Sequence, residues 1–485
     1  MNIGAIILIT LITLIIHNNT MQIPFSKETY TNRRKKLAGD LGKGLLLFPG
    51  NNEVGMNYAG NPYPFRQDSN FLYFFGIAQP GLFATIDAES GESILFGDEL
   101  TMEDIVWTGP QPSLAELAER TGIDKVLPSA ELAGYVEKAK SGGATLHFTP
   151  PYRYDNMLKL EQLTGIGAAE QKAAASADLI RAIVAQRAHK SPEEVACIEE
   201  AVNITRSMHL GVMLAATEGK KESELAGIAL GISYGLGRGV AYGIILSVNG
   251  HILHNHYHGN ALKKGQLVLG DFGAEANSHY AGDITRTFPV DKKFTQKQRE
   301  IYQIVLDAEN KAIASLKPGV KYMDVHLEAS RQMATGLKQL GLMKGDIDEA
   351  VAQGAHALFF PHGLGHMLGL DVHDMEDLGE QYVGYNEEVQ RSTQFGTAYL
   401  RLARAMEPGF VLTVEPGIYF IPELIDQWQA EGKFTDFINY DKVNEYRDFG
   451  GIRIEDNVLI TEDGHRVLGT PIPKTVEEVE ALRQR

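Results

Sequence analysis

Cysteine is almost absent from this chain of 485 residues, since Cys197 is the only one. A single cysteine excludes an intrachain disulfide and is typical of a reducing compartment. Its neighbours Ala196 and Ile198 continue a helical pattern, which predicts a small core residue and not a nucleophile. The cysteine usage therefore predicts a cytoplasmic protein.

Positive charge is also scarce. The chain has 45 Lys and Arg against 62 Asp and Glu, which gives a net charge of −17. A nucleic-acid interface needs clustered basic residues, so we expect no nucleic-acid partner. The one basic run, 33–36, lies in a helical pattern and predicts a solvated helix face.

Long hydrophobic runs are missing except for Ile3 to Ile16. A membrane span needs about 20 apolar residues, so this shorter run predicts no stable membrane partner. No Lys or Arg precedes the run and no small-residue cleavage site follows it, unlike a secretory signal peptide. Residues 1–20 are predicted to be a hydrophobic leader, or to precede the true start at Met21, and export or tethering stays an alternative.

The length predicts two or three domains. In residues 21–180, short apolar runs at 44–48 and 83–86 predict strands, and helical spacing at 114–120 and 130–139 predicts helices. This segment is expected to form an α/β domain that ends near residue 180.

Residues 181–485 open with Ser191, Pro192 and Glu194, the pattern of a capping box, which predicts a long helix to about residue 215. Further strands and helices are expected from their apolar patterns: strands at 240–253, 266–272, 411–414 and 452–460, and helices at 296–316 and 325–340. Strands mixed with long helices, without regular βαβ units, predict an α+β domain.

Five potential metal ligands in this second half are embedded in apolar or glycine-rich sequence. They are Asp271 in Leu-Gly-Asp-Phe-Gly, Asp283 in Gly-Asp-Ile-Thr-Arg, His366 in His-Gly-Leu-Gly-His, Glu415 in Thr-Val-Glu-Pro-Gly and Glu455 in Gly-Ile-Arg-Ile-Glu. Four converging buried carboxylates would repel one another unless dications lie among them. Four oxygen donors and an imidazole suit two divalent metals, most simply Mn²⁺, with Co²⁺ or Zn²⁺ as alternatives.

Each carboxylate also has a simpler interpretation. Asp271 and Asp283 could be turn residues, Glu415 a rim carboxylate, and Glu455 part of the exposed polar face of an edge strand. The histidines distinguish a functional site from a structural role more clearly than the carboxylates do. Glycines between His362 and His366 predict a tight loop, and His373 follows closely. The alternating His254, His256 and His258 could form a second metal patch or a wet hairpin tip.

Together these motifs resemble the aminopeptidase P and prolidase branch of the "pita-bread" metallopeptidases. The resemblance rests on 282–289, 362–366, 413–417 and 451–455, with 65–77 resembling the N-terminal domain of that family. It implies a pita-bread catalytic domain (residues 181–485), proline-containing peptides as substrates, and a homodimer or homotetramer.

The resemblance also implies roles for individual residues. Asp271 would hold one metal and Asp283 would bridge both, while His366 and Glu415 would hold the second and Glu455 would bridge. A bridging water would become the nucleophile and Glu415 the proton shuttle. His254, His362 and His373 would orient substrate and stabilise the oxyanion, with Arg453 anchoring this network.

The branch of the family is left open. Segments 381–405 and 419–448 resemble prolidase, which cleaves dipeptides only, whereas 282–287 and 344–349 resemble aminopeptidase P, which we favour. The separation of twelve residues between Asp271 and Asp283 is one longer than usual for the family, which puts the path of the loop near 277–279 in doubt. A metal-free binding protein and a metal-free amidinohydrolase are less favoured, because all five candidate ligands are present.

Overall fold

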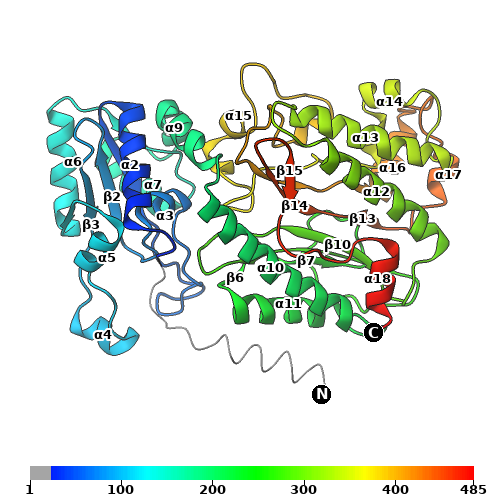
Figure 1. Cartoon of the computed structure of the whole chain (residues 1–485), viewed down its shortest axis with the longest axis horizontal. Coiled ribbons are helices and arrows are strands. Elements are labelled where there is room, and N and C mark those ends of the chain that lie inside the picture. The colour runs from blue at the N-terminus through cyan, green and yellow to red at the C-terminus, as the bar shows by residue number, and fades with distance from the viewer. Residues whose placement is uncertain (1–22) are drawn as a thin grey trace. The chain divides into compact units, whose positions relative to one another are not determined.

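The structure is a computed structural model that describes residues 23–485, so the expected leader at 1–20 lies outside the described residues. The chain divides into two compact units (Figure 1). Unit 1 ends at Arg187 and also includes Glu376–Tyr382, and unit 2 comprises Ala188–Met375 and Val383–Arg485. Within residues 23–485, no helix is both long and apolar enough to span a bilayer.

Unit 1 is built on a mixed five-stranded sheet with the strand order β4-β3-β2-β1-β5. Strands β1, β2 and β3 pair antiparallel, whereas β5 and β4 pair in parallel with β1 and β3. Its strands are β1 (Leu45–Pro49), β2 (Phe83–Asp87), β3 (Ser93–Phe96), β4 (Lys125–Leu127) and β5 (Leu146–His147). Alternating side chains such as Leu45 and Leu47 enter the core, as the pleat requires.

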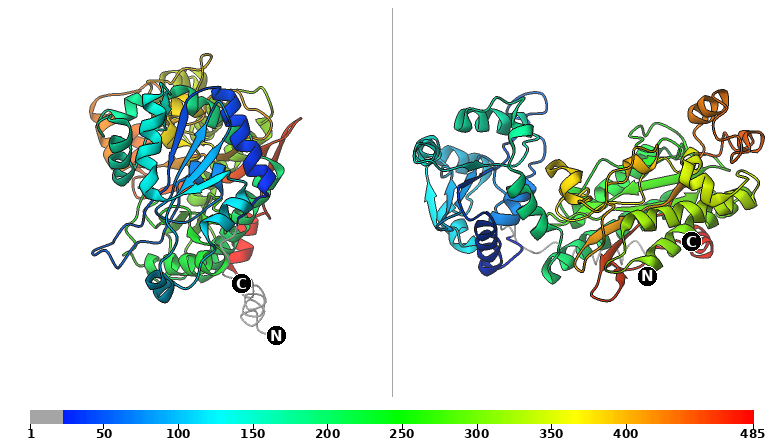
Figure 2. Two further views of the ribbon diagram at one scale, coloured as in Figure 1. Left: turned by 90° about the vertical axis from the view of Figure 1, so that its left-hand side faces the viewer. Right: turned by 90° about the horizontal axis from the view of Figure 1, so that it is seen from above.

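Helices cover this sheet, and α2 and α6 lie on either side of its strands (Figure 1 and the left view of Figure 2). The helices of unit 1 are α2 (Lys27–Leu41), α3 (Ser69–Phe75), α4 (Met102–Thr108), α5 (Leu114–Thr121), α6 (Leu132–Ser141), α7 (Tyr154–Thr164), α8 (Gln171–Ala174) and α9 (Ala177–Arg187). The prediction of a solvated basic face on α2 is wrong for Arg33 and Arg34, which are buried. Arg34 donates hydrogen bonds to the carbonyls of Phe74 and Thr121, at the ends of α3 and α5.

Unit 2 contains two long helical pairs, α10 with α11 and α12 with α13, and strands β7, β10 and β13 run between them (Figure 1). Its helices are α10 (Pro192–Ala215), α11 (Glu222–Leu236), α12 (Gln296–Ser315), α13 (Tyr322–Gln339), α14 (Ile347–Gln353), α15 (Glu380–Val383, shared with unit 1), α16 (Pro422–Ala430), α17 (Tyr440–Asn444) and α18 (Val476–Arg483). The capping box at α10 is confirmed, because Ser191 and Glu194 each accept a hydrogen bond from the other's backbone N–H.

The strands of unit 2 form short antiparallel sheets in the orders β10-β8-β7, β11-β14-β15, β12-β13 and β6-β9. They are β6 (Gly239–Val240), β7 (Ile245–Ser247), β8 (Leu267–Phe272), β9 (Ala274–Glu275), β10 (Ile284–Pro289), β11 (Val411–Val414), β12 (Gly417–Tyr419), β13 (Gly451–Arg453), β14 (Asp456–Ile460) and β15 (His465–Val467). The mixture of helices with antiparallel strands confirms the α+β class.

Two strand predictions are wrong in detail. The strand expected at 452–460 is interrupted at Ile454 and Glu455, because β13 pairs with β12 whereas β14 pairs with β11. The strand expected at 240–253 is limited to β6 and β7, and His254 lies in the following loop. Glu455 therefore lies where the chain leaves its pairing with β12 and begins to pair with β11.

Candidate metal centre

All nine residues singled out from the sequence line one cavity of about 490 Å³ in unit 2. The five candidate ligands come from separate segments. Asp271 lies on β8, Asp283 precedes β10, His366 lies in a loop, Glu415 joins β11 to β12, and Glu455 joins β13 to β14. Except for Glu415, whose side chain is 18% exposed, these ligands are buried.

Strand pairing brings the two aspartates together. Antiparallel β8 and β10 place Thr285 opposite Asp271, so the end of one strand meets the start of the other. Because β8 is the central strand of its sheet, Asp271 also lies opposite Ile245 of β7. The simpler interpretation as a turn or edge residue is therefore wrong for Asp271, which lies in the central strand of its sheet, and both aspartates are buried, at 8% and 5% exposed.

The loop that carries His366 is held along strand β11. The N–H of Thr413 donates to the carbonyl of His366, and the N–H of Glu415 donates to the carbonyl of Leu364. Gly365 permits this approach, since a Cβ at that position would lie 2.1 Å from the carbonyl oxygen of Thr413. Gly365 thus allows the loop of His366 to lie close to the strand that leads to Glu415.

The hydrogen bonding of His366 turns one ring nitrogen towards the carboxylates. Its Nδ1 lies 2.9 Å from the carbonyl oxygen of Met367, which can only accept, so Nδ1 carries the proton. Its Nε2 lies 3.3 Å from Asp283 Oδ2 and 3.8 Å from Glu415 Oε1. A histidine that donates one N–H to a carbonyl and turns its other nitrogen towards carboxylates has the arrangement usual for metal ligands.

The charges of the site also fit bound cations. Burial raises the pKa of Glu415 to about 8, and raises the pKa values of Asp271 and Glu455 in the same direction. Burial opposes ionisation of Asp283 too, but its interactions with His366 and Tyr242 outweigh burial and lower the pKa. Glu455 Oε1 is buried without a partner among the described residues.

Three ligand atoms, from Asp283, His366 and Glu455, lie within 4.8 Å of one another. Such a distance suits donors around a common ion. The surplus of buried carboxylates, the orphaned oxygen and the available imidazole nitrogen therefore fit divalent metals. The simpler interpretation of Glu455 as part of an exposed edge face is wrong, because it is 2% exposed.

The remaining predicted residues surround these ligands. His362 donates from Nδ1 to the carbonyl of Gly363, so its Nε2 accepts the hydroxyl of Tyr419 at 2.8 Å. Burial and the charge of Arg453 lower the pKa of His362 to about 3, and lower that of His254 in the same direction. Arg453 donates to Tyr419, Thr285 and Asp271. The ring of His373 meets that of His366 edge-on, with centroids 4.3 Å apart.

Several cavity residues were missed by sequence reasoning. The hydroxyl of Tyr242 bonds to both Asp271 and Asp283, and Tyr419 connects His362 with Arg453. Arg401 and Tyr399 reach the cavity from the segment 381–405. Isolated aromatic residues and arginines carry no spacing signal, so only their position in the fold identifies them.

Comparison with known proteins identifies the family. The family model "Metallopeptidase family M24" matches residues 196–462, and "Aminopeptidase P, N-terminal domain" matches residues 30–147. The chain belongs to metallopeptidase family M24. The suspected family and the assignment as a hydrolase are thereby confirmed.

Relatives of this M24 peptidase carry two different names. Xaa-Pro aminopeptidase of Escherichia coli K12 is 35% identical, over 94% of this chain and 98% of its own. Human Xaa-Pro dipeptidase is 32% identical, over 96% of this chain and 94% of its own. Both relatives act at Xaa-Pro bonds by name, and similarity alone does not separate the two activities.

Solved structures agree with this family. Aminopeptidase P from E. coli with the inhibitor Pro-Leu has a TM-score of 0.78 at 32% identity, over 95% of this chain and 98% of that chain. The Zn-substituted E. coli enzyme in complex with product matches equally well. The likeness confirms the expected pita-bread fold preceded by an aminopeptidase P-type N-terminal domain.

Proposed function

We propose that this M24 peptidase is a dinuclear-metal aminopeptidase that hydrolyses the Xaa-Pro bond at the N-terminus of peptides. The observation that carries the proposal is the available Nε2 of His366 among four carboxylates in one cavity. The names of the E. coli relatives support the substrate class.

Five residues would hold the metals. Asp271 would bind one ion and Asp283 both, while His366 and Glu415 would bind the second ion and Glu455 both. We propose Mn²⁺ as the native metal, with Co²⁺ or Zn²⁺ as substitutes, because all three accept oxygen and imidazole donors. When bound, two divalent ions acidify the nucleophilic water near neutral pH.

The protein's own groups would then complete the reaction. Glu415 would take a proton from the attacking water and pass it to the leaving nitrogen. His254 and His373 would donate hydrogen bonds to the developing oxyanion, and His362 would help to orient the substrate. Arg453 would keep His362 oriented through the hydroxyl of Tyr419.

The decisive test is a peptide assay. The purified protein, loaded with Mn²⁺ and compared with a chelated sample, would be incubated with Ala-Pro and Ala-Pro-Ala. Cleavage of both peptides, abolished by chelation, is expected. Failure to cleave either peptide while metal is bound would refute the proline assignment.

A second candidate function is that of a dipeptidase specific for Xaa-Pro, favoured by Arg401. Its guanidinium group lines the cavity, and a dipeptide would present a free carboxylate directly after proline. Under this alternative Ala-Pro alone is cleaved, and Arg401→Ala raises KM for Ala-Pro at least ten-fold, the order expected for a lost charge-assisted pair. An equal effect on both peptides would remove this argument for a dipeptidase.

We also propose a cytoplasmic location and self-association into a homodimer or homotetramer. The single cysteine supports the location. Helix α4, on which Met102, Val106 and Trp107 are each more than 70% exposed, supports self-association. Cell fractionation and light scattering of the purified protein would test these two points.

A further inference from the structure

Four ionisable side chains form a network around the strand that follows Glu455. They are Arg286 on β10, Asp456 on β14, Glu309 on α12 and Lys474, which lies between β15 and α18. None of them lines the cavity. Lys474 also lies beyond residue 462, where the match to the M24 family model ends.

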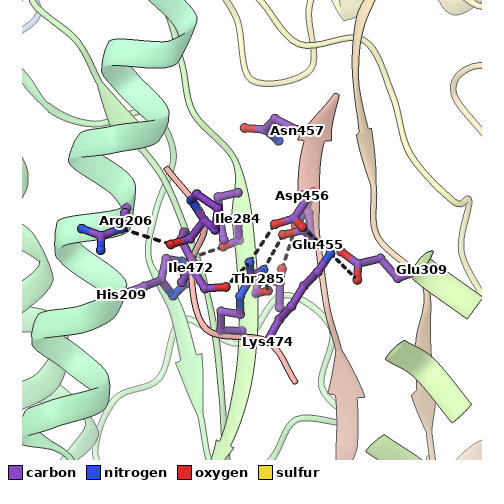
Figure 3. Close-up of polar contacts among 12 residues, drawn as sticks. Arg206, His209, Ile284, Thr285, Glu309, Glu455, Asp456, Asn457, Ile472 and Lys474 are labelled. Atoms are coloured by element: carbon purple, nitrogen blue, oxygen red, sulfur yellow. Dashed lines mark hydrogen bonds and ion pairs between the residues drawn. The ribbon is translucent and has the colours of Figure 1, made fainter. Parts of the chain in front are cut away.

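The contacts run in one continuous series. Arg286 Nη2 donates to Asp456 Oδ1 at 2.7 Å, and Lys474 Nζ donates to Asp456 Oδ2 at 2.7 Å and to Glu309 Oε2 at 2.9 Å. Figure 3 shows Lys474 extended between Asp456 and Glu309. Glu309 is fully buried, and Arg286 is 1% exposed.

The series ends on the main chain of a candidate ligand. Arg286 Nη1 donates to the carbonyl oxygen of Glu455 at 2.7 Å. The N–H of Glu455 donates to the carbonyl of Thr285, and Thr285 Oγ1 donates to Glu455 Oε2 at 2.7 Å (Figure 3). Backbone and side chain of Glu455 are therefore both fixed by β10.

The adjacent residue extends this control to a second ligand. The Asn457 side chain accepts from the N–H of Asp283 at 3.0 Å and donates to the Asp283 carbonyl. Asn457 itself is fully buried. The segment from Glu455 to Asn457 thus connects Glu455 and Asp283, the two residues proposed to bind both metals. The network contacts this segment through the side chain of Asp456.

Removal of Lys474 would disturb this arrangement, because Lys474 contacts both carboxyl groups of the network. Without it, the buried carboxyl groups of Asp456 and Glu309 would remain near one buried arginine. A buried carboxylate that loses its partner recruits another cation or draws in water. Arg286 is the nearest cation, and any shift towards the two carboxylates would weaken its bond to the Glu455 carbonyl.

We propose that Lys474 is a positioning residue of the metal centre, acting on Glu455 through Asp456 and Arg286. This inference rests on the proposed function, because it assumes that Glu455 binds metal. The C-terminal segment, which lies outside all the signature motifs, would thereby influence metal affinity. Asp456, Arg286 and Glu455 lie between Lys474 and the metal, and the effect would pass along them because ligand geometry is set by the groups that hold the ligands.

The test compares three variants of the full-length protein. Lys474→Met removes the charge, Lys474→Arg keeps it, and Glu309→Gln leaves the contact between Lys474 and Asp456 in place. Arg299→Met is the matched control, because Arg299 on α12 pairs with Glu480 on α18 without touching the network. Affinity for Mn²⁺ would be measured by competition with a chelating dye, and ligand geometry by the visible absorption of the Co²⁺-loaded protein.

Lys474→Met is expected to weaken Mn²⁺ binding about ten-fold, the lower end of the effect of groups that hold metal ligands. Its Co²⁺ spectrum should change, and kcat for Ala-Pro should fall with little change in KM. Lys474→Arg should restore affinity to within about three-fold, and Glu309→Gln and Arg299→Met should bind like the unmodified protein.

Two results would overturn the inference. One is a Lys474→Met protein that is less stable in urea but keeps the original Mn²⁺ affinity and Co²⁺ spectrum, since Lys474 would then be purely structural. The other is an equal loss of affinity in Arg299→Met. If Lys474→Met does not fold, Lys474→Gln serves instead. A loss of Mn²⁺ affinity is expected in that variant, and an unchanged affinity would contradict the inference. Failure of the unmodified protein to bind metal would refute the proposed function instead.

Discussion

The stability of the metal-free protein should depend on pH through Glu415. Burial raises the pKa of this carboxyl group from 4.5 to about 8. The folded protein therefore holds the proton more tightly than the unfolded chain, so folding is most favoured at low pH. Stability should be lost as the pH rises from about 4.5 towards 8.

The size of the expected loss in the free energy of unfolding follows from the width of this pH range. Between pH 5.5 and pH 7.5 the unfolded chain has released this proton and the folded protein retains it. Each pH unit in this interval lowers the free energy of unfolding by about 1.4 kcal/mol, so the expected loss is about 2.7 kcal/mol. The raised pKa values of Asp271 and Glu455 act in the same direction.

The assay is urea unfolding of the protein in a chelating buffer at pH 5.5, 6.5 and 7.5. Trp428 is buried in unit 2 and provides the fluorescence signal. With an m-value near 3 kcal/mol/M, the midpoint should fall by about 0.9 M across this range. Glu415→Gln cannot ionise, so it should reduce the pH dependence to the part that Asp271 and Glu455 contribute, and stabilise the metal-free protein at pH 7.5.

The control is Glu462→Gln, which removes an exposed carboxylate in the turn before β15 and should leave the pH dependence unchanged. Saturating Mn²⁺ should abolish the pH dependence of the unmodified protein by neutralising the carboxylates. A Glu415→Gln protein with the same pH dependence as the unmodified protein would refute the argument that burial of Glu415 strains the metal-free site.

Three further variants test separate parts of the structure. Asp283→Ala should abolish metal binding and peptidase activity while the circular dichroism spectrum stays unchanged, and retained activity would exclude Asp283 as a ligand. Lys190→Met should lower the free energy of unfolding by about 3 kcal/mol in urea, because it removes the buried ion pair between Lys190 and Asp374 at 2.9 Å. Ser191→Ala removes the cap of α10 and should cost about 1 kcal/mol, with a loss below a few tenths contradicting the role of the capping box.

Helix boundaries could be predicted because their causes are local. The start of α10 depends on Ser191, Pro192 and Glu194, which lie within four residues of one another. The same holds for α12 and α13, whose apolar spacing predicts them to within three residues at each end. Strands were predicted less well, and the break at Glu455 was missed, because β13 and β14 are defined by different partner strands.

The candidate ligands could be recognised from the chain alone, since each carries its own short motif of apolar residues and glycines. How they meet is visible only in the folded protein: which nitrogen of His366 faces the carboxylates, that Tyr242 joins the two aspartates, and that Lys474 reaches Asp456. These contacts join residues that are distant in the chain. They depend on strand register and helix packing, which no local pattern encodes, and this is why the chemistry of the ligands was visible in the sequence but their support was not.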